Sequence, residues 1–468
     1  MFETRFLTSR KKACVRMAEG VRLDIFDVGS RQEFAKDFLS SDPISWPGYP
    51  QQLTRARATS GTDQAVSVGT ARVGGVPCAF IEFNFKFLGG SLGWAEGQRI
   101  KAAFDHAINY RLPLVSVTAS GGARMQEGTV ALAQMQRIAE SVGKARRAGA
   151  PHICVILDPT TGGVWASLAA PADLIIAVPD ARIGFAGSRT MPAGSDPHGN
   201  AFHSKGKWES GFVDLLLAPE EVRGQLSIAL VLLGQQSRGP QWSPANLPQV
   251  PAEDSGWNTD ATAELAGWDQ VVQARSPGRP RAQAYIDSYF ESFVEIRGDR
   301  AGGVDSGIRC GFGRAQGRTV ALIAQLGQPT SASGYRTALR LIQLAERFNL
   351  PIMSLVDTPG APSDENAELE GVGTAISEML IAMADARVPI TSVIIGEGGS
   401  GGALALLAPD STWMAEDSFL AVTAPELATA ILKGSSSQVP TISDQLRLTP
   451  ADQVALGLVR GVLRRPRP

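Results

Sequence analysis

The stretch Arg111–Gly128, RLPLVSVTASGGARMQEG, returns in altered form as NLPIMSLVDTPGAPSDEN at Asn349–Asn366. The two copies lie 238 residues apart, so that Gly122 matches Gly360. Each copy begins with a short run of apolar, often β-branched residues, which predicts a buried strand. Each then enters a turn that contains glycine. The pair therefore predicts the same strand–turn unit in both halves of the chain.

A second matching unit follows in each half. DPTTGGVWAS begins at Asp158, and IGEGGSGGALAL begins at Ile395. We match the pair Gly162–Gly163 with Gly401–Gly402, at a spacing of 239 residues. Two matched units in the same order and at nearly the same spacing indicate an internal duplication. Repeated strand–turn–helix units with buried strands predict an α/β fold built on a mainly parallel sheet.

Six prolines between positions 235 and 283 mark the clearest boundary in the chain. Such a stretch excludes a long helix or a central strand. Its tryptophans, Trp242, Trp257 and Trp268, favour a segment that packs on the protein surface. We therefore expect a first domain over residues 1–234, a linker over 235–283 and a second domain over 284–468.

The composition excludes several classes of protein. The 468 residues are 44% hydrophobic, and 44 Lys and Arg stand against 46 Asp and Glu, for a net charge of −2. This balance argues against a nucleic-acid-binding protein. The most apolar stretch, residues 390–408, contains Glu397 and five glycines, so it predicts a buried strand, turn and helix rather than a membrane span.

The four cysteines form no CxxC pair, which argues against a zinc ribbon or a disulfide framework. No His, Cys and carboxylate cluster has the spacing of a metal site, so no metal is expected. The N-terminal segment MFETRFLTSRKKAC lacks the apolar stretch of a signal peptide. Together these features predict a cytoplasmic protein.

A glycine pair between a strand and a helix exposes backbone N–H groups, and the helix start adds partial positive charge. Such a turn is an anion site, either for a phosphate or as an oxyanion hole for an enolate or a tetrahedral intermediate. Each half supplies two of these turns. They are Ser120–Ala123, Thr161–Val164, Thr358–Ala361 and Ser400–Ala403.

Other catalytic motifs are excluded because the sequence lacks residues that they require. Ser400 lies in a G-x-S-x-G string, but a hydrolase of that type has its histidine later in the chain, and all four histidines come before residue 204. His198 and His203 occupy a Gly- and Pro-rich loop, where we expect no catalytic role. No GxxxxGK[ST] string is present, which excludes a P-loop NTPase, and no GxGxxG opens a first βαβ unit.

Several polar residues have two interpretations. Arg124 and Glu127 are three residues apart at a helix start, which is typical of a surface ion pair. Arg336 is a candidate contact for a carboxylate or a phosphate, and a solvated helix start is the alternative. The C-terminal string RRPRP is either an anion contact or a solvated end.

Several strings of the sequence resemble those of a known family. The strings SGGARMQEG, DPTTGGVWAS and IGFAG resemble the β subunit of the bacterial acetyl-CoA carboxylase carboxyltransferase. The strings RGDRA, SGYRTALRLIQLAERFNLPI, VDTPGA and IGEGGSGGALAL resemble its α subunit. The chain looks like the two subunits fused in the order β, α.

The resemblance implies two homologous crotonase-like (ClpP-like) domains of ββα superhelical units. It implies transfer of a carboxyl group from carboxybiotin, on a carrier protein, to an acyl-CoA. In such enzymes carboxybiotin releases CO2, the ureido nitrogen takes the α-proton of the thioester, and the enolate attacks CO2. Backbone N–H groups hold the enolate and ureido oxygens, in agreement with the glycine turns.

The resemblance also implies roles for individual residues. In the β-like, acyl-CoA side, Gly122, Gly162 and Gly163 serve the thioester oxygen. In the α-like, biotin side, the biotin oxygen is served by Gly360, Gly401, Gly402 and Ala403. The candidate substrate-binding residues are Gly121, Ala123, Arg124, Trp165, Arg336 and Ala361.

The sequence contains neither a biotin-acceptor MKM segment nor an ATP-grasp-sized domain. The resemblance therefore implies separate biotin carboxylase and biotin carboxyl carrier protein partners. Similar enzymes place the site between halves of different protomers, so we expect at least a homodimer. Neither nucleic acid nor a membrane is expected as a partner.

Three departures from the family pattern concern the substrate. The zinc ribbon of the β family is absent, Trp165 replaces a small residue, and the basic stretch before Gly334 is reduced to LGQPTSAS. Trp165 either narrows the acyl or pantetheine channel or packs outward. The leading expectation is acetyl-CoA carboxylation to malonyl-CoA. The alternatives are a malonate or malonyl-carrier decarboxylase and a non-catalytic scaffold.

Overall fold

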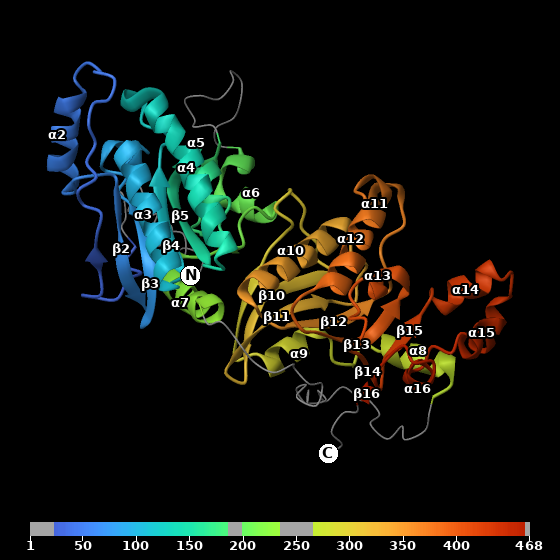
Figure 1. Cartoon of the computed structure of the whole chain (residues 1–468). Helices are drawn as coiled ribbons and strands as arrows, with labels where there is room; N and C mark the ends of the chain where they lie inside the picture. Colours follow the sequence, from blue (N-terminus) through green and yellow to red (C-terminus); the bar gives the residue numbers. More distant parts are fainter. Residues whose placement is uncertain (1–22, 186–198, 235–264, 464–468) are drawn as a thin grey trace, which may run out of the picture. The chain divides into compact units, whose positions relative to one another are not determined.

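The computed structural model describes residues 23–185, 199–234 and 265–463. The chain divides into two compact units, Met1–Gly234 (unit 1) and Gln235–Pro468 (unit 2). Each unit contains one eight-stranded sheet (Figure 1). None of the described helices is long and apolar enough to cross a membrane.

Unit 1 is built on a mixed sheet in the order β1-β2-β3-β4-β5-β6-β8, with β7 paired to β5. The first three strands are antiparallel and the others parallel. The strands are β1 (Gln32–Glu33), β2 (Val66–Val73), β3 (Val76–Phe83), β4 (Leu114–Ser120), β5 (His152–Thr161), β6 (Leu174–Ala177), β7 (Ile183–Gly184) and β8 (Leu215–Leu216). The α-helices are α2 (Tyr49–Ser60), α3 (Trp94–Tyr110), α4 (Gly128–Arg147), α5 (Gly162–Val164), α6 (Ser204–Glu209) and α7 (Pro219–Gly234).

Unit 2 repeats this sheet in the order β16-β14-β13-β12-β11-β10-β9, with β15 paired to β13. The strands are β9 (Ser292–Ile296), β10 (Ile308–Ala315), β11 (Arg318–Gln325), β12 (Ile352–Thr358), β13 (Ile390–Gly399), β14 (Thr412–Ala415), β15 (Phe419–Ala421) and β16 (Val462–Leu463). The helices are α8 (Gly267–Arg275), α9 (Ala282–Tyr289), α10 (Ala332–Phe348), α11 (Glu365–Leu369), α12 (Val372–Asp385), α13 (Ser400–Leu404), α14 (Pro425–Ile431), α15 (Val439–Gln445) and α16 (Pro450–Ala455).

The strand pairing confirms the duplication. β4 pairs with β5 through Leu114 and His152, and β12 pairs with β13 through Ile352 and Ile390, both in parallel. Each of these ladders has one register shift, just before the strand ends. Unit 1 and unit 2 therefore share one topology, which is the predicted parallel-rich α/β fold.

The registers correct one detail of the sequence comparison. The strands β5 and β13 end at Thr161 and Gly399, so the spacing stays at 238 residues through the second turn. Gly162 therefore corresponds to Ser400, and Gly163 to Gly401. The match of the glycine pairs at 239 residues was one residue out, because glycine identity was followed instead of strand register.

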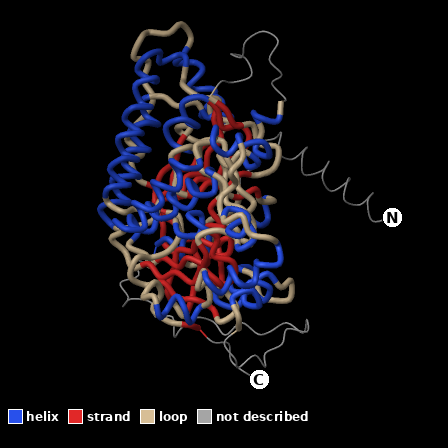
Figure 2. The backbone as a smooth tube through the Cα atoms, turned by 90° about the vertical axis from the view of Figure 1, so that its right-hand side faces the viewer, coloured by secondary structure: helices blue, strands red, loops and turns tan. Residues whose placement is uncertain are grey.

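Helices cover both faces of each sheet. The central strands β4 and β12 are therefore buried along their whole length. In unit 1, Ile100 and Phe104 of α3 pack with Ile138 of α4 against the core side of β2 and β3. In unit 2, α9 packs on β11, β12 and β13. Figure 1 shows α10 and α12 on the other face of that sheet, and Figure 2 shows helices outside the strands.

Residues 235–264 of the expected linker lie outside the described residues. The part that follows contains α8, whose Gln270 donates to the carbonyl oxygens of Glu416 and Ser418 at 2.9 Å each. Trp268 packs on a buried cluster that includes Phe419. The described end of the segment is therefore folded onto unit 2.

Candidate functional site

The two glycine turns of each unit touch one another at the carboxyl ends of neighbouring parallel strands. In unit 1, a Cβ added to Gly162 would lie 3.2 Å from the Cα of Gly122. In unit 2, a Cβ added to Gly402 would lie 2.8 Å from the carbonyl carbon of Gly360 and 2.6 Å from the nitrogen of Ala361. The turns are packed backbone against backbone, so side chains at these positions have no room.

The first turn of each unit is closed in the same way. The N–H of Gly122 donates to the Ser120 hydroxyl and the N–H of Gly360 donates to the Thr358 hydroxyl, each at 3.1 Å. Both glycines have positive φ, 106° and 131°. In this arrangement their own N–H groups are used inside the turn. Both glycines therefore help to close the first turn of their unit.

The second turn begins a helix, so its N–H groups are the candidate anion donors. α5 starts at Gly162 and α13 starts at Ser400. N–H groups in a first helical turn have no intrahelical acceptor and carry partial positive charge. Gly401 is exposed, and nothing lies within 4 Å of an added Cβ. The surface beside this turn of unit 2 is therefore open at Gly401.

The remaining glycine-turn residues differ in exposure. Gly121 is exposed, and its added Cβ would lie 3.5 Å from the Gly89 oxygen. Gly163 is buried, and its added Cβ would lie 2.8 Å from the sulfur of Met135. Ala403 is fully buried, and Ala123 forms an isolated bridge with Leu92. Ala361 is partly buried.

A buried tyrosine supports the second turn of unit 2. Tyr335 is fully buried, and its hydroxyl donates to the carbonyl oxygen of Gly402 at 3.0 Å. That carbonyl belongs to the first turn of α13, so the bond holds the helix start in place. Burial raises the pKa of Tyr335, which stays a neutral hydroxyl. The sequence contained Tyr335 in a motif string, but no spacing linked it to Gly402.

Arg124 corrects the expected surface ion pair. Its side chain is buried and pairs with Glu96 at 2.7 Å and with Glu127 at 3.1 Å, and both carboxylates are also buried. Tyr49 donates to Glu127 at 2.6 Å, and the Arg124 guanidinium also donates to Ser40 and Ser91. Protein acceptors surround the guanidinium, which suits a role in fixing the first turn rather than contact with a ligand.

The pKa of Arg124 reflects two opposing effects. Burial disfavours the charged guanidinium, but the carboxylates of Glu96 and Glu127 outweigh this and raise its pKa. Burial also raises the pKa of Tyr49, so its hydroxyl remains a donor to Glu127. The Arg124 guanidinium is therefore permanently charged, and protein groups in this cluster accept its hydrogen bonds.

We expect Arg124→Met to lower the free energy of unfolding by about 3–5 kcal/mol, because it leaves two buried carboxylates without their cation. Urea denaturation followed by circular dichroism measures this. Arg182→Met is the matched control, because Arg182 pairs with Asp158 at 2.8 Å but is 45% exposed. A similar loss in both variants would contradict the buried-support interpretation.

The two remaining candidate side chains also have neighbours within their unit. Arg336 pairs with Asp299 at 2.8 Å and donates to the Glu370 oxygen at 3.2 Å, with 35% of its side chain exposed. Trp165 is 9% exposed, so its side chain lies within unit 1 rather than in solvent. It begins a π-helical turn, Trp165–Ala169, directly after α5.

No group of three or more His, Cys, Asp or Glu that could hold a metal occurs in the described ranges. His152 is buried, and its Nε2 lies 2.8 Å from the Ser116 hydroxyl. His106 stacks between Phe34 and Tyr110. His198 lies outside the described residues.

Ser400 has the left-handed φ of 56°, where Gly162 has 62°. We expect Ser400→Gly to keep the carboxyl-transfer activity that the family resemblance implies within about threefold, since only the backbone of this position has a role. The free energy of unfolding should change by less than about 1 kcal/mol, because relief of left-handed strain offsets the added chain entropy. Steady-state assays check this, and loss of all activity would restore Ser400 as a nucleophile.

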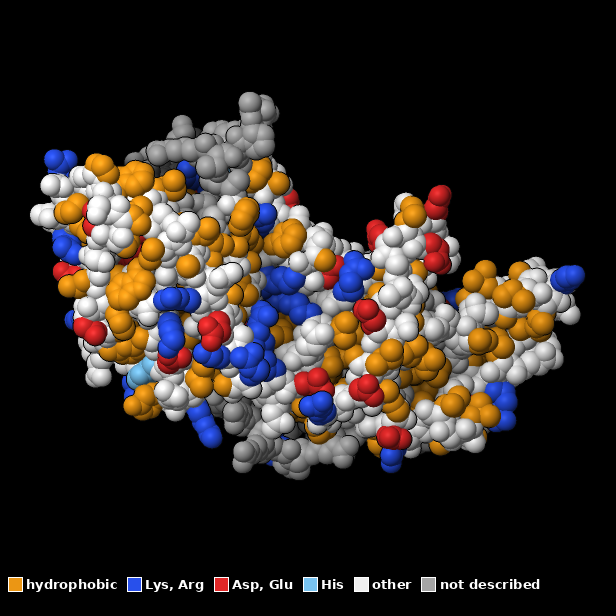
Figure 3. All heavy atoms as spheres, turned by 45° about the horizontal axis from the view of Figure 1, so that its top comes forward, with side chains coloured by type: hydrophobic (Ala, Val, Ile, Leu, Met, Phe, Trp, Pro, Cys, Tyr) orange, Lys and Arg blue, Asp and Glu red, His pale blue; other side chains and the backbone are white. Residues whose placement is uncertain are grey.

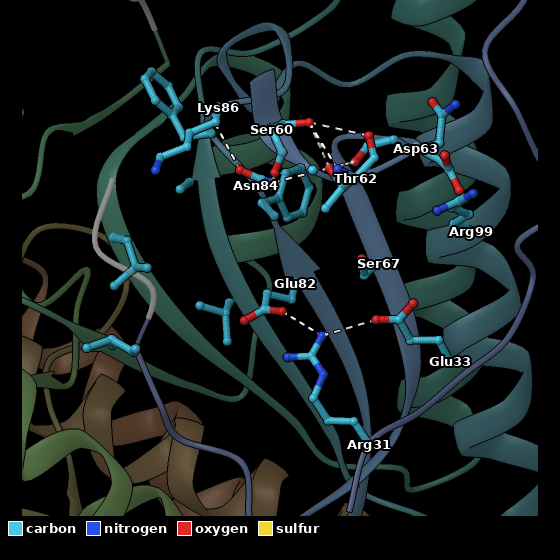
Figure 4. A pocket seen from close by; sticks show the side chains of 18 of the residues that line it. Arg31, Glu33, Ser60, Thr62, Asp63, Ser67, Glu82, Asn84, Lys86 and Arg99 are labelled. Atoms are coloured by element: carbon cyan, nitrogen blue, oxygen red, sulfur yellow. Dashed lines mark hydrogen bonds and ion pairs between the residues drawn. The ribbon is translucent and has the colours of Figure 1, made fainter. Parts of the chain in front are cut away.

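A polar cavity of about 760 Å³, not predicted from the sequence, lies in unit 1. Figure 4 shows Arg31 in it, paired with Glu82 at 2.7 Å and with Glu33 at 3.5 Å. Its walls reach Ala119 and Asp158, which precede the two glycine turns. The cavity is thus adjacent to the turns, and its charges are of both signs.

The sequence models of two families match the chain. One, described as the carboxyl transferase domain, matches residues 39–197. The other, described as acetyl co-enzyme A carboxylase carboxyltransferase-like, matches residues 245–468. A curated protein of Salinispora arenicola, the acetyl-coenzyme A carboxylase carboxyl transferase subunits beta/alpha, is 39% identical over 98% of this chain and 83% of its own length. The chain belongs to the acetyl-CoA carboxylase carboxyltransferase family.

Other relatives of this carboxyltransferase carry related names. The protein of the same name from Clostridium tetani is 36% identical over 94% of this chain and 78% of its own length. A probable biotin-dependent acyl-coenzyme A carboxylase beta3 subunit of Mycobacterium bovis is 31% identical over 90% of this chain and 84% of its own length. The family thus includes proteins named for acetyl-CoA and one named for acyl-CoA.

A solved structure shares the carboxyltransferase fold. The transcarboxylase 12S hexamer, solved with methylmalonyl-coenzyme A and methylmalonic acid bound, matches 99% of this chain and 93% of its own chain, with a TM-score of 0.76 at 20% identity. This similarity concerns the fold alone, and it confirms the expected pair of crotonase-like units.

Proposed function

We propose that this carboxyltransferase moves a carboxyl group from carboxybiotin, on a carrier protein, to an acyl-CoA. The observation that carries the proposal is the pair of touching glycine turns in both units. Carboxyl transfer creates oxyanion character on two partners, the thioester enolate and the biotin ureido group. Two anion sites built from backbone N–H groups match that need.

The roles that we assign to unit 1 and unit 2 follow the family resemblance. We assign the thioester oxygen to the α5 start in unit 1, with Gly162 and Gly163, and the biotin oxygen to the α13 start in unit 2, with Gly401, Gly402 and Ala403. Carboxybiotin supplies CO2 when bound. The chain itself orients the two oxygens and holds their developing charge, and Gly122 and Gly360 shape the turns that pack against the donors. We also propose residues 1–234 and 284–468 as the two domains, with residues 235–283 between them, the described part of which packs on unit 2.

Acetyl-CoA is the substrate that we propose, with malonyl-CoA as product. The names of the relatives from Salinispora and Clostridium support this choice. The acyl-CoA name of the Mycobacterium relative supports a longer chain as the second candidate. Trp165, buried directly after the donor turn of unit 1, favours the smaller acyl group because it fills space there.

Separate biotin carboxylase and biotin carboxyl carrier proteins are the proposed partners, and the proposed assembly is at least a homodimer. Apolar side chains support an assembly surface on unit 2, where Val422, Leu427, Ile431 and Leu432 are each more than half exposed. Figure 3 shows hydrophobic side chains gathered over the part of unit 2 that carries α14 and α15.

A coupled assay tests the proposal. The purified chain is mixed with biotin carboxylase, biotinylated carrier, ATP, bicarbonate and a panel of acyl-CoAs, and the thioesters are followed by mass spectrometry. We expect malonyl-CoA only when biotinylated carrier is present. Loss of malonyl groups without carboxylation would favour the malonate or malonyl-carrier decarboxylase alternative, and no turnover at all would favour the scaffold alternative.

A further inference from the structure

The register of β12 against β13 shifts near the ends of the two strands, directly before the glycine turns. Val356 pairs with Ile394, and Thr358 pairs with Gly398. One residue of β12, Asp357, therefore faces three residues of β13. Such a bulge leaves backbone groups without ladder partners and bends the strand. The bulge lies directly before the second turn of unit 2.

A buried ion pair binds the backbone of this bulge. Asp357 and Arg279 are each 1% exposed in their side chains and meet at 2.6 Å. The Asp357 carboxylate also accepts the Glu397 N–H at 3.1 Å, and the Arg279 guanidinium donates to the Ile395 carbonyl oxygen at 3.2 Å. The pair thus satisfies one donor and one acceptor of the bulged segment.

Further contacts fix the position of the Arg279–Asp357 pair. Arg279 belongs to the connection between α8 and α9 and also donates to the Ala274 carbonyl oxygen. A Cβ on Gly396 would overlap the guanidinium, so the arginine lies flat against the bulged backbone. Arg275 holds the Glu397 side chain at 2.8 Å. The end of α8 and the connection from α8 to α9 therefore hold the strand that carries the second turn.

Unit 1 has the same bulge, but the uncharged Ala119 stands where unit 2 has Asp357. Thr118 pairs with Ile156 and Ser120 pairs with Thr160, so Ala119 faces three residues of β5. The residue corresponding to Glu397 is Pro159, which has no N–H to satisfy. The Leu157 carbonyl oxygen, corresponding to that of Ile395, accepts from the Thr160 hydroxyl at 3.0 Å.

We propose that Arg279 and Asp357 are positioning residues that set the second glycine turn of unit 2 against the first and thereby orient its anion-binding N–H groups. The pair acts through the backbone of β13 and touches no substrate. The division between units rests on the proposed function, in which unit 2 serves biotin. Loss of the pair should therefore weaken the use of biotin while leaving acyl-CoA binding intact.

Asp357→Asn is the main test, because it preserves shape and removes only the carboxylate charge, which holds Arg279 at 2.6 Å and also pairs with Arg281 at 3.3 Å. We expect kcat to fall at least tenfold and KM for biotinylated carrier to rise at least fivefold, with KM for acyl-CoA unchanged within twofold. Arg279→Lys should behave alike, since an ammonium cannot match the planar guanidinium. Arg447→Met, which removes an exposed pair with Asp452 in the same unit, is the control and should leave kinetics unchanged.

Hydrogen exchange provides a second readout that does not depend on activity. In Asp357→Asn, amide exchange over residues 396–403 should accelerate at least tenfold, and exchange over residues 158–165 should stay as in the parent chain. A fall in kcat that merely follows the folded fraction, with both KM values and turn exchange unchanged, would overturn the proposal. An inactive parent chain would contradict the proposed function instead, and the exchange result would still decide the positioning role.

Discussion

Gly402→Ala should lower kcat for carboxyl transfer by about 100- to 1000-fold, the loss expected when an oxyanion-hole donor is displaced. The added Cβ would lie 2.6 Å from the Ala361 nitrogen and 2.8 Å from the Tyr335 hydroxyl. The first of these is backbone and cannot move away as a side chain could. The two turns of unit 2 must therefore separate, which misdirects the N–H groups at the start of α13. Steady-state kinetics with varied biotinylated carrier measures the effect.

The neighbouring glycine provides the matched control. Gly401→Ala meets nothing within 4 Å and needs no backbone change, so the fold and its melting temperature should stay as they are. Any loss of activity in this variant reports contact with the ligand rather than damage to the turn. Equal activity of Gly402→Ala and the parent chain would contradict the backbone-donor account of unit 2.

Gly122→Ala should have the second large effect, on the acyl-CoA side. Its φ of 106° is accessible to glycine but strained for any residue with a Cβ, which costs about 1–3 kcal/mol. The turn that closes on the Ser120 hydroxyl would open and displace the Gly162 backbone, which lies against it. We expect kcat/KM for acyl-CoA to fall by about 100-fold or more, with KM for carrier little changed. Kinetics with varied acyl-CoA checks this.

Gly121→Ala is the control for this variant. Gly121 is exposed and its added Cβ would lie at an ordinary contact distance of 3.5 Å from the Gly89 oxygen. Its melting temperature should match that of the parent chain, whereas that of Gly122→Ala should fall. If both variants lost stability and activity alike, the turn conformation would not explain the role of Gly122.

The sequence predicted the parts of this protein that depend on local pattern. Buried apolar runs followed by glycine turns correctly predicted β4, β5, β12 and β13, and their repetition predicted the two-unit α/β fold. The same pattern placed Gly122 and Gly360 in turns. It could not give the hydrogen bonds that occupy their N–H groups, because a hydroxyl two residues earlier has many conformations.

The parts that the sequence missed depend on contacts between distant residues. Arg124 and Glu127 are three apart, which allows either an exposed or a buried pair, and burial is decided by Glu96 and Tyr49 from other elements. Arg279 lies 78 residues from Asp357, so no local spacing connects them. Tyr335 reaches Gly402 over 67 residues. Strand register also corrected the glycine match that residue identity had suggested.

We propose that one chain handles both the thioester and biotin, and an experiment with the purified chain alone tests this. Malonyl-CoA labelled with 13C in its free carboxyl group is incubated with free biotin, and both products are followed by mass spectrometry. The account predicts labelled carboxybiotin and acetyl-CoA in equal initial amounts, with no turnover when biotin is left out. Acetyl-CoA and labelled CO2 formed at the same rate without biotin would contradict it.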